Sequence, residues 1–111
     1  MTVATGSVIV APNVLIRLLS FAIREVPGVA RLGSAPRARA GLRGVSGAGV
    51  VTQSGADGVS ADCYVIAQAE TNLLELGTAV QATVAAVIQE LAGMAVREVN
   101  IYIQDVEAGS G

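Results

Sequence analysis

Residues 11–32, with the sequence APNVLIRLLSFAIREVPGVARL, decide the first half of the fold. Pro12 suits the first turn of a helix, where its missing N–H is not needed. Pro27 and Gly28 stop the helix, because Pro cannot continue it and Gly tolerates a left-handed cap. The apolar residues between them recur at three- and four-residue steps, which predicts a core-facing stripe. The stripe consists of Leu15, Leu18, Leu19, Ala22 and Val26.

The apolar sector of this helix is wider than burial on one side needs. The additional apolar positions are Val14, Ile16, Phe21 and Ile23. The polar positions of the opposite face are Arg17, Ser20 and Arg24. We therefore expect the helix to contact something on a second side, either a tail of its own chain or another subunit.

Other segments have the pattern of strands. Thr5–Val10 contains a β-branched run and is predicted to be a short strand. Val50–Gln53 and Val59–Ala69 are predicted to form a hairpin around the turn-rich residues 55–58. Residues 96–106, VREVNIYIQDV, alternate between apolar and polar residues and predict a closing strand. The predicted buried positions of the last two strands are Val59, Ala61, Cys63, Val65, Ala67, Val99, Ile101 and Ile103.

A second helix is predicted to begin after Asn72, which forms a capping box with Glu75, and to end at Gly93. Its expected core stripe is Leu73, Leu76, Val80, Val84, Val87 and Leu91. Residues 33–49, rich in Gly, Ala, Ser and Pro, are predicted to be a loop. The order β-α-β-β-α-β predicts an α+β fold, a two-layer sandwich of two helices and a four-stranded, mainly antiparallel sheet. This order is compatible with a ferredoxin-like sheet.

Length and composition restrict the class of protein. The 111 residues predict one domain, residues 5–106, followed by a flexible tail at residues 107–111. Apolar residues make up 52% of the chain but aromatic residues only 3%, so the core must be aliphatic. The single Cys fits a reducing cytoplasm, and neither a signal peptide nor a stretch of about 20 apolar residues is present. We expect a soluble cytoplasmic domain.

The side chains that most enzymes use are scarce. The chain has no His, which removes the commonest general base and a common metal ligand. Cys63 has no His to activate it, and it lies on the predicted buried face of its strand. No Gly-rich phosphate-binding motif follows a strand. The acids Asp57, Asp62, Asp105 and Glu107 have no spacing typical of a catalytic pair. We therefore expect no catalytic residues, no cofactor and no metal.

One segment has a local excess of positive charge. No acid lies between Glu25 and Asp57, a stretch that contains four of the seven arginines. These candidate contacts for an anionic partner are Arg31, Arg37, Arg39 and Arg43. Such a loop can bind lipid headgroups, nucleic acid or an acidic protein surface, or it can be a solvated loop that aids solubility. No aromatic residues are interleaved with these arginines, so the pattern is a weak signal for nucleic-acid binding.

The polar face of the predicted sheet is a second candidate surface. Tyr64, Ile66 and Tyr102 are the candidate interface residues on it. RNA-binding relatives of this architecture stack bases on aromatic residues of the two central strands. Here Thr5–Val10 supplies no aromatic partner for Tyr64, and Tyr102 is expected on an edge strand. We therefore expect these residues to pack against a tail or a second subunit.

Taken in this order, the segments resemble the alkaline shock protein family, the bacterial envelope stress response proteins. The resemblance rests on an Ile/Val-rich segment, a Pro-Asn-Val-Leu helix start, and four later matches. These matches are Val26-Pro27-Gly28-Val29, Asp62-Cys63-Tyr64-Val65, Val80-Gln81 and residues 99–106. The resemblance implies a non-enzymatic, cytoplasmic protein that gathers at the membrane through a membrane-anchored partner. It supplies no catalytic residues.

Three functions remain open at this point. The leading hypothesis is a homo-oligomerising scaffold that supports the cell-envelope stress response or envelope homeostasis. The first alternative is a nucleic-acid-binding module that uses the arginine-bearing loop. The second alternative is a small-ligand-binding domain or an accessory subunit of an enzyme.

Overall fold

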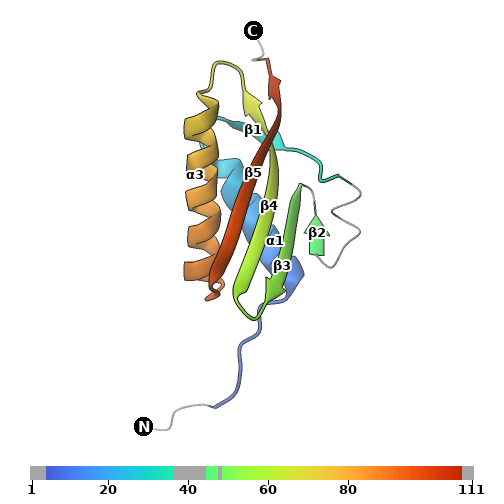
Figure 1. Cartoon of the computed structure of the whole chain (residues 1–111), viewed down its shortest axis with the longest axis vertical. Coiled ribbons are helices and arrows are strands. Elements are labelled where there is room, and N and C mark those ends of the chain that lie inside the picture. Colours follow the sequence, from blue (N-terminus) through green and yellow to red (C-terminus); the bar gives the residue numbers. More distant parts are fainter. Residues whose placement is uncertain (1–4, 37–44, 48, 109–111) are drawn as a thin grey trace.

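The computed structural model describes residues 5–36, 45–47 and 49–108. Two helices cover one face of a twisted sheet, so the protein has two layers (Figure 1). The elements follow in the order α1 (Pro12–Glu25), β1 (Val29–Leu32), β2 (Val45–Gly47), β3 (Val50–Gly55), β4 (Gly58–Gln68), α3 (Leu73–Ala86), the π-helical turn η1 (Val87–Leu91) and β5 (Val96–Glu107).

Strand β4 is the centre of the sheet. β5 runs parallel to it along one edge, from the pair Val59–Val96 to the pair Gln68–Glu107. The other edge is shared, because β3 pairs antiparallel with residues 58–63 and β1 pairs antiparallel with residues 65–67. β2 then pairs antiparallel with β3. The five strands thus make a sheet four strands wide, and the predicted α+β class is confirmed.

The core lies between β4 and the two helices. The alternation predicted for β4 is confirmed, because its five inward side chains, Val59, Ala61, Cys63, Val65 and Ala67, are at most 1% exposed. The helices bury Leu19 and Ile23 of α1 and Val80 and Val84 of α3 against them. Val99 of β5 is buried, and Ile101 and Ile103 pack against the same cluster. The core is therefore aliphatic, as the composition predicts.

The predicted helix and hairpin ends are also present. Pro12 is the first residue of α1. The Asn72 side chain accepts a hydrogen bond of 3.0 Å from the backbone N–H of Glu75, and this bond caps α3. Gly58 begins β4 with a φ of +121°, a conformation that L side chains rarely adopt. The turn between β3 and β4 therefore requires glycine at this position.

The predicted strand at Thr5–Val10 is wrong. The segment forms no strand, and Val8 and Ile9 are 97% and 87% exposed. Both edges of β4 are occupied by β5 and by β1 with β3, so the segment finds no place beside the central strand. The first element in the described part of the chain is therefore α1, and the first strand of the expected β-α-β-β-α-β order is missing there.

Two further differences concern segments without a strong apolar pattern. Val29–Leu32, which follows the predicted helix stop and was assigned to no element, is strand β1. Val45–Gly47, inside the predicted loop, is strand β2. Both are short strands that exist because β4 and β3 offer them backbone partners. β5 continues to Glu107, one residue into the predicted tail. The remaining tail residues 109–111 and loop residues 37–44 and 48 lie outside the described residues.

The buried faces of the two helices differ from the stripes that their spacing predicts. Ser20, placed on the polar face of α1, is only 7% exposed, because Ile16 and Ile23 widen the buried side. The ends of the α3 stripe are not buried, since Leu73 is 42% and Leu91 is 66% exposed. Spacing alone does not show where the sheet beneath a helix ends.

Candidate functional site: the open sheet face and the edge groove

The sheet face that points away from the helices is here called the open sheet face. Alternation along β4, with a register shift in β5 between Ile103 and Asp105, places five side-chain pairs on it. In order along the strands they are Ser60–Glu98, Asp62–Asn100, Tyr64–Tyr102, Ile66–Asp105 and Gln68–Glu107. The face therefore has a polar end, an aromatic centre and a second polar end.

The aromatic centre is closed by contacts within the chain. The rings of Tyr64 and Tyr102 are stacked, with centroids 4.7 Å apart and planes 11° apart. Tyr64 is 3% and Ile66 is 6% exposed, whereas Tyr102 is half-buried. The structure thus brings together two of the three predicted interface residues. Tyr64 offers little ring surface to a base or a partner, and Tyr102 is the member of the set that reaches the surface.

The segment after β1 covers part of this face. The backbone N–H of Ser34 donates to Oε1 of Gln104 (2.9 Å), and Nε2 of Gln104 donates back to the Ser34 carbonyl (2.7 Å). The Gly33 N–H also donates to the Tyr64 carbonyl (2.7 Å). A Cβ atom at residue 33 would overlap the Gln104 side chain. The glycine therefore permits this covering, for which the sequence gives no other signal.

The polar end holds two carboxylates in one hydrogen-bond group. Nδ2 of Asn100 donates to Oδ1 of Asp62 (3.0 Å) and to Oε1 of Glu98 (2.7 Å). Nearby, Nε of Arg97 donates to Oγ of Ser60 (2.8 Å). The shallow cavity between them measures about 120 Å³. Within the described part of the chain, no group of three or more His, Cys, Asp or Glu could hold a metal ion.

Asp62 and Asp105, two of the acids considered from the sequence, lie far apart on the open sheet face. Asp62 lies opposite Asn100, and Asp105 lies opposite Ile66, four residues further along β4. Four residues of strand span about 13 Å. This separation is too long for two carboxylates that act on one bond, for which about 5 to 9.5 Å is usual in glycosidases.

A more open surface, with a mixed apolar and uncharged polar lining, lies beside the sheet between α3 and β5. This edge groove has a volume of about 400 Å³. Leu73 is 42% and Leu74 is 82% exposed at its helix side. Its lining contains no charged residue and consists of Leu73, Leu74, Gly77, Thr78, Gln81, Val99, Asn100, Ile101, Tyr102 and Ile103.

The edge groove is the feature that sequence reasoning missed. Leu73 was expected in the core stripe of the helix, and Leu74 was not assigned to any surface. The signal was the Leu73-Leu74 pair itself, because adjacent helical residues lie about 100° apart and cannot both follow one narrow stripe. Nε2 of Gln81 donates to the Val99 carbonyl (3.0 Å), which ties the helix to the strand beside the groove.

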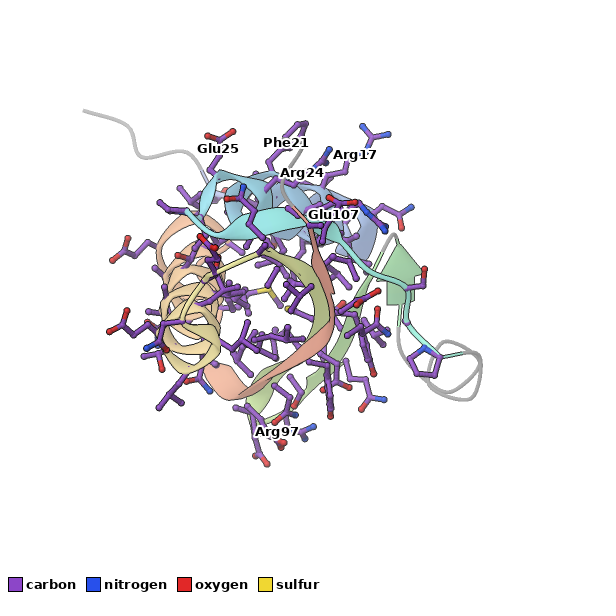
Figure 2. All side chains as sticks on the ribbon, turned by 90° about the horizontal axis from the view of Figure 1, so that it is seen from above. Arg17, Phe21, Arg24, Glu25, Arg97 and Glu107 are labelled. Atoms are coloured by element: carbon purple, nitrogen blue, oxygen red, sulfur yellow. The ribbon has the colours of Figure 1, made fainter. Side chains whose placement is uncertain are left out.

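The outer side of α1 is a second exposed surface. Val14 is 48% and Phe21 is 65% exposed, and the Arg24 guanidinium lies 5.3 Å from the centroid of the Phe21 ring. Figure 2 shows Arg17, Phe21 and Arg24 projecting outward together, on the side of the molecule opposite Arg97. No tail of the described chain covers this side. Contact with another subunit stays a prediction.

Comparison with known families identifies the group to which the chain belongs. A family model described as the ASP23 family, with a cell envelope-related function, matches residues 1–108. The chain belongs to this alkaline shock protein family. The expected resemblance is thereby confirmed over almost the whole chain. No curated protein sequence matches it.

Solved structures agree with the fold of this family member. The MamM CTD, residues 215–293, superposes with a TM-score of 0.58 at 17% sequence identity, covering 89% of this chain and 100% of that chain. The nickel form of a variant of that domain gives a TM-score of 0.56 at 16% identity, covering 88% of this chain and 99% of that chain. At this identity the likeness concerns the α+β fold alone.

Of the four arginines expected to contact an anionic partner in this family member, the structure describes one. Arg31 lies on β1, and its Nε is 3.4 Å from Oε1 of Glu107 on β5. Both side chains are more than half exposed, so the ion pair contributes little to stability. Arg37, Arg39 and Arg43 lie outside the described residues. An anionic partner for this segment stays a prediction.

The helices of this alkaline shock protein family member are shorter than the thickness of a bilayer requires. Within the described residues, none is long and apolar enough to span a bilayer. α1 and α3 have 14 residues each, whereas a spanning helix needs about 20.

The one thiol of the chain is buried. Burial, with a smaller contribution from the charge of Asp62, raises the pKa of Cys63 from 9.0 to about 12. The thiolate is the reactive form of cysteine, so the native thiol should be inert. We expect Ellman's reagent to leave Cys63 unmodified in the folded protein at pH 8 and to modify it on unfolding. Rapid modification of the native protein would contradict this placement.

The same shift predicts how stability depends on pH. Because the folded pKa is raised, the unfolded chain loses the thiol proton first, and Cys63 favours unfolding as the pH rises from about 9 to 12. Within this window its contribution should fall by about 1.4 kcal/mol per pH unit. Urea unfolding of the wild type and of Cys63→Ala at several pH values measures this. We expect a shallower decline for the variant above pH 9, and parallel declines would contradict the assignment.

Proposed function

We propose that this chain is a non-enzymatic, self-associating interaction protein within the envelope-related function of its family. The observation that carries the proposal is the uncharged edge groove beside the exposed Leu73 and Leu74. Exposed apolar surface of this kind marks sites where soluble proteins bind other proteins. The edge strand β5 next to it adds backbone groups that can pair with a further strand.

The chemistry of the side chains supports a role without catalysis. The chain contains no His, and its only thiol is buried with a raised pKa. Asp62 and Glu98 share the amide of Asn100, which holds them in a structural hydrogen-bond group. The ring of Tyr102 stacks on that of Tyr64, and Tyr64 is buried. Binding through surfaces is the function that these features favour.

For a membrane-anchored partner, the outer side of α1 is the surface we favour. Phe21 and Arg24 form an exposed cation–π pair there, and aromatic and Arg side chains are enriched at protein interfaces. This surface lies on α1, whereas the edge groove lies between α3 and β5. One copy can therefore use the groove for another copy and α1 for the partner.

Two measurements test this function. Light scattering of the purified wild-type protein should give a mass above that of one chain, rising with concentration. Membrane fractions from cells should contain the protein, and Phe21→Ala should move most of it to the soluble fraction without unfolding it. A mass of one chain at all concentrations would contradict self-association. Equal membrane fractions for the wild type and Phe21→Ala would contradict the assigned partner surface.

A further inference from the structure

We propose that the N-terminal arm, residues 5–11, of one copy binds as an additional strand along the free edge of β5 in a second copy. The apolar side chains of the arm would lie in the edge groove. This inference rests on the self-association proposed above and assigns the surfaces that produce it.

The arm has a sequence typical of a strand but pairs with no strand of its own chain in the described structure. Val8, Ile9 and Val10 are consecutive β-branched residues, which favour extended backbone. Val8 is 97% and Ile9 is 87% exposed, although both are strongly apolar. Val10 packs partly against the core and fixes the root of the arm. Two large apolar side chains are thus held in solvent on a segment that belongs to no helix or strand.

The acceptor is an edge strand without a second strand partner. β5 has 12 residues and pairs with β4 along one edge, and within the described sheet no strand pairs with its other edge. Long edge strands usually carry a Pro, a Lys or a bulge that blocks further pairing. The part of β5 that lines the groove, Val99–Ile103, contains no Pro and no charged residue. The Val99 carbonyl accepts from Nε2 of Gln81, so strand addition would use the backbone between Asn100 and Ile103.

Charge supports the match between arm and groove. The arm contains no charged residue, and the lining of the groove contains none. Docking would remove apolar surface from water on both partners without burying an unpaired charge. A basic or acidic segment would not have this advantage in the same groove.

Gly77 leaves open space in the edge groove beside α3. It lies inside the helix, where glycine is less stable than alanine, yet a Cβ atom there would meet nothing within 4 Å. Packing within one chain therefore does not require this glycine. It lines the edge groove and widens the space between helix and strand. A strand of a second copy is an occupant that would use this space.

The positions of arm and groove favour a second copy over the same chain. Figure 1 shows the arm leaving the molecule at the start of α1 and running away from the body. The groove is lined by the first half of α3, which begins at the opposite end of the molecule. An arm of seven residues extends at most about 25 Å. Each copy thus offers an arm at one end and a groove toward the other.

Cysteine cross-linking between two differently tagged proteins tests the contact. One carries Val8→Cys or Ile9→Cys, which point to opposite sides of an extended strand, and the other carries Leu74→Cys. The native Cys63 is fully buried and does not interfere. Under mild oxidation we expect one arm variant to form the mixed disulfide on the order of tenfold faster than the Phe21→Cys control, which is also exposed. Equal rates for arm and control would overturn the proposal.

A substitution at Gly77 tests the groove in the same assay. Gly77→Leu in the Leu74→Cys protein should fill the groove and lower the cross-linking rate to that of the Phe21→Cys control. Gly77→Ala is the matched control, because a methyl group meets open space, and it should keep most of the rate. Unchanged cross-linking in Gly77→Leu would overturn the assigned groove.

Light scattering on the wild type and on a variant without residues 7–10 separates the inference from the proposed function. A wild-type mass above that of one chain, with a single-chain mass for the shortened variant, would support both self-association and the binding of the arm. Equal masses above that of one chain would overturn the arm while leaving self-association in place. A wild type of single-chain mass would contradict self-association itself. Loss of association in Gly77→Leu but not in the shortened variant would assign the groove to another part of the second copy and overturn the arm.

Discussion

Replacing Leu19 by alanine is expected to lower the free energy of unfolding by about 3 to 5 kcal/mol. Leu19 is 0% exposed and belongs to the core cluster that joins α1 to β4 and α3. The core has no large aromatic side chain to close around the lost volume, so a cavity should remain. Urea unfolding followed by circular dichroism measures the change, with an m-value close to that of the wild type.

Phe21→Ala is the matched control on the same helix. Phe21 is larger than Leu19 but 65% exposed, so its removal should change the free energy of unfolding by less than about 1 kcal/mol. A larger loss for Phe21→Ala than for Leu19→Ala would mean that α1 packs on the sheet through its other face. The described orientation of the helix would then be wrong.

Gly58→Ala is the second substitution for which a large effect is expected, a loss of about 2 to 4 kcal/mol. The residue has a φ of +121°, and a Cβ atom would lie 2.5 Å from the carbonyl oxygen of Ala95. That oxygen accepts the N–H of Val59 (2.8 Å), which joins the start of β4 to the chain before β5. The methyl group therefore forces either the turn or this contact to move. Thermal or urea unfolding gives the size of the loss.

Gly55→Ala tests the same turn without the steric conflict. Gly55 pairs with Gly58 across the hairpin, but the nearest atom to its Cβ would be Nη1 of Arg97, at 3.9 Å. Its φ is not in the left-handed range, so we expect a change of less than about 1 kcal/mol. Similar losses for Gly55→Ala and Gly58→Ala would show that the conformation of the turn differs from the described one.

The parts of the fold that follow from local physics were predictable from the sequence. Pro12 and the pair Pro27-Gly28 bound α1 because of their backbone restrictions, and the Asn72 cap begins α3 through its own hydrogen bond. The alternation of side chains along β4 follows from the geometry of a strand, and β5 keeps it from Val99 to Ile103, between two shifts of its register. The family resemblance is confirmed because it rests on these elements in this order.

The parts that depend on which strands meet were not predictable from the sequence. Thr5–Val10 has the composition of a strand, but the direct parallel pairing of β4 with β5 leaves it outside the sheet. Val29–Leu32 lacks a strong strand pattern and becomes β1 because the end of β4 has an open edge there. Strand composition gives a propensity, and only the assembled sheet decides which segments find a partner.

The candidate site shows the same division. Tyr64 and Tyr102 were predicted, with Ile66, to be interface residues, but the stacking of the two rings, which covers Tyr64, depends on the register of β4 and β5. The exposure of Leu74 depends on where the sheet ends beneath α3, which its spacing does not encode. Arg31 was singled out for its charge, and the structure gives it Glu107, a residue 76 positions away, as a partner. Surfaces formed by segments far apart in the sequence could thus be identified only from the structure.

The most direct test of the central claim is the mass of the protein in solution, measured by sedimentation equilibrium over a range of concentrations. The wild type is compared with the double variant Val8→Asp and Ile9→Asp, whose substituted positions are both exposed and should leave the fold unchanged. We expect a wild-type mass above that of one chain and a single-chain mass for the variant. A wild type of single-chain mass at every concentration, or a variant as heavy as the wild type, would contradict it.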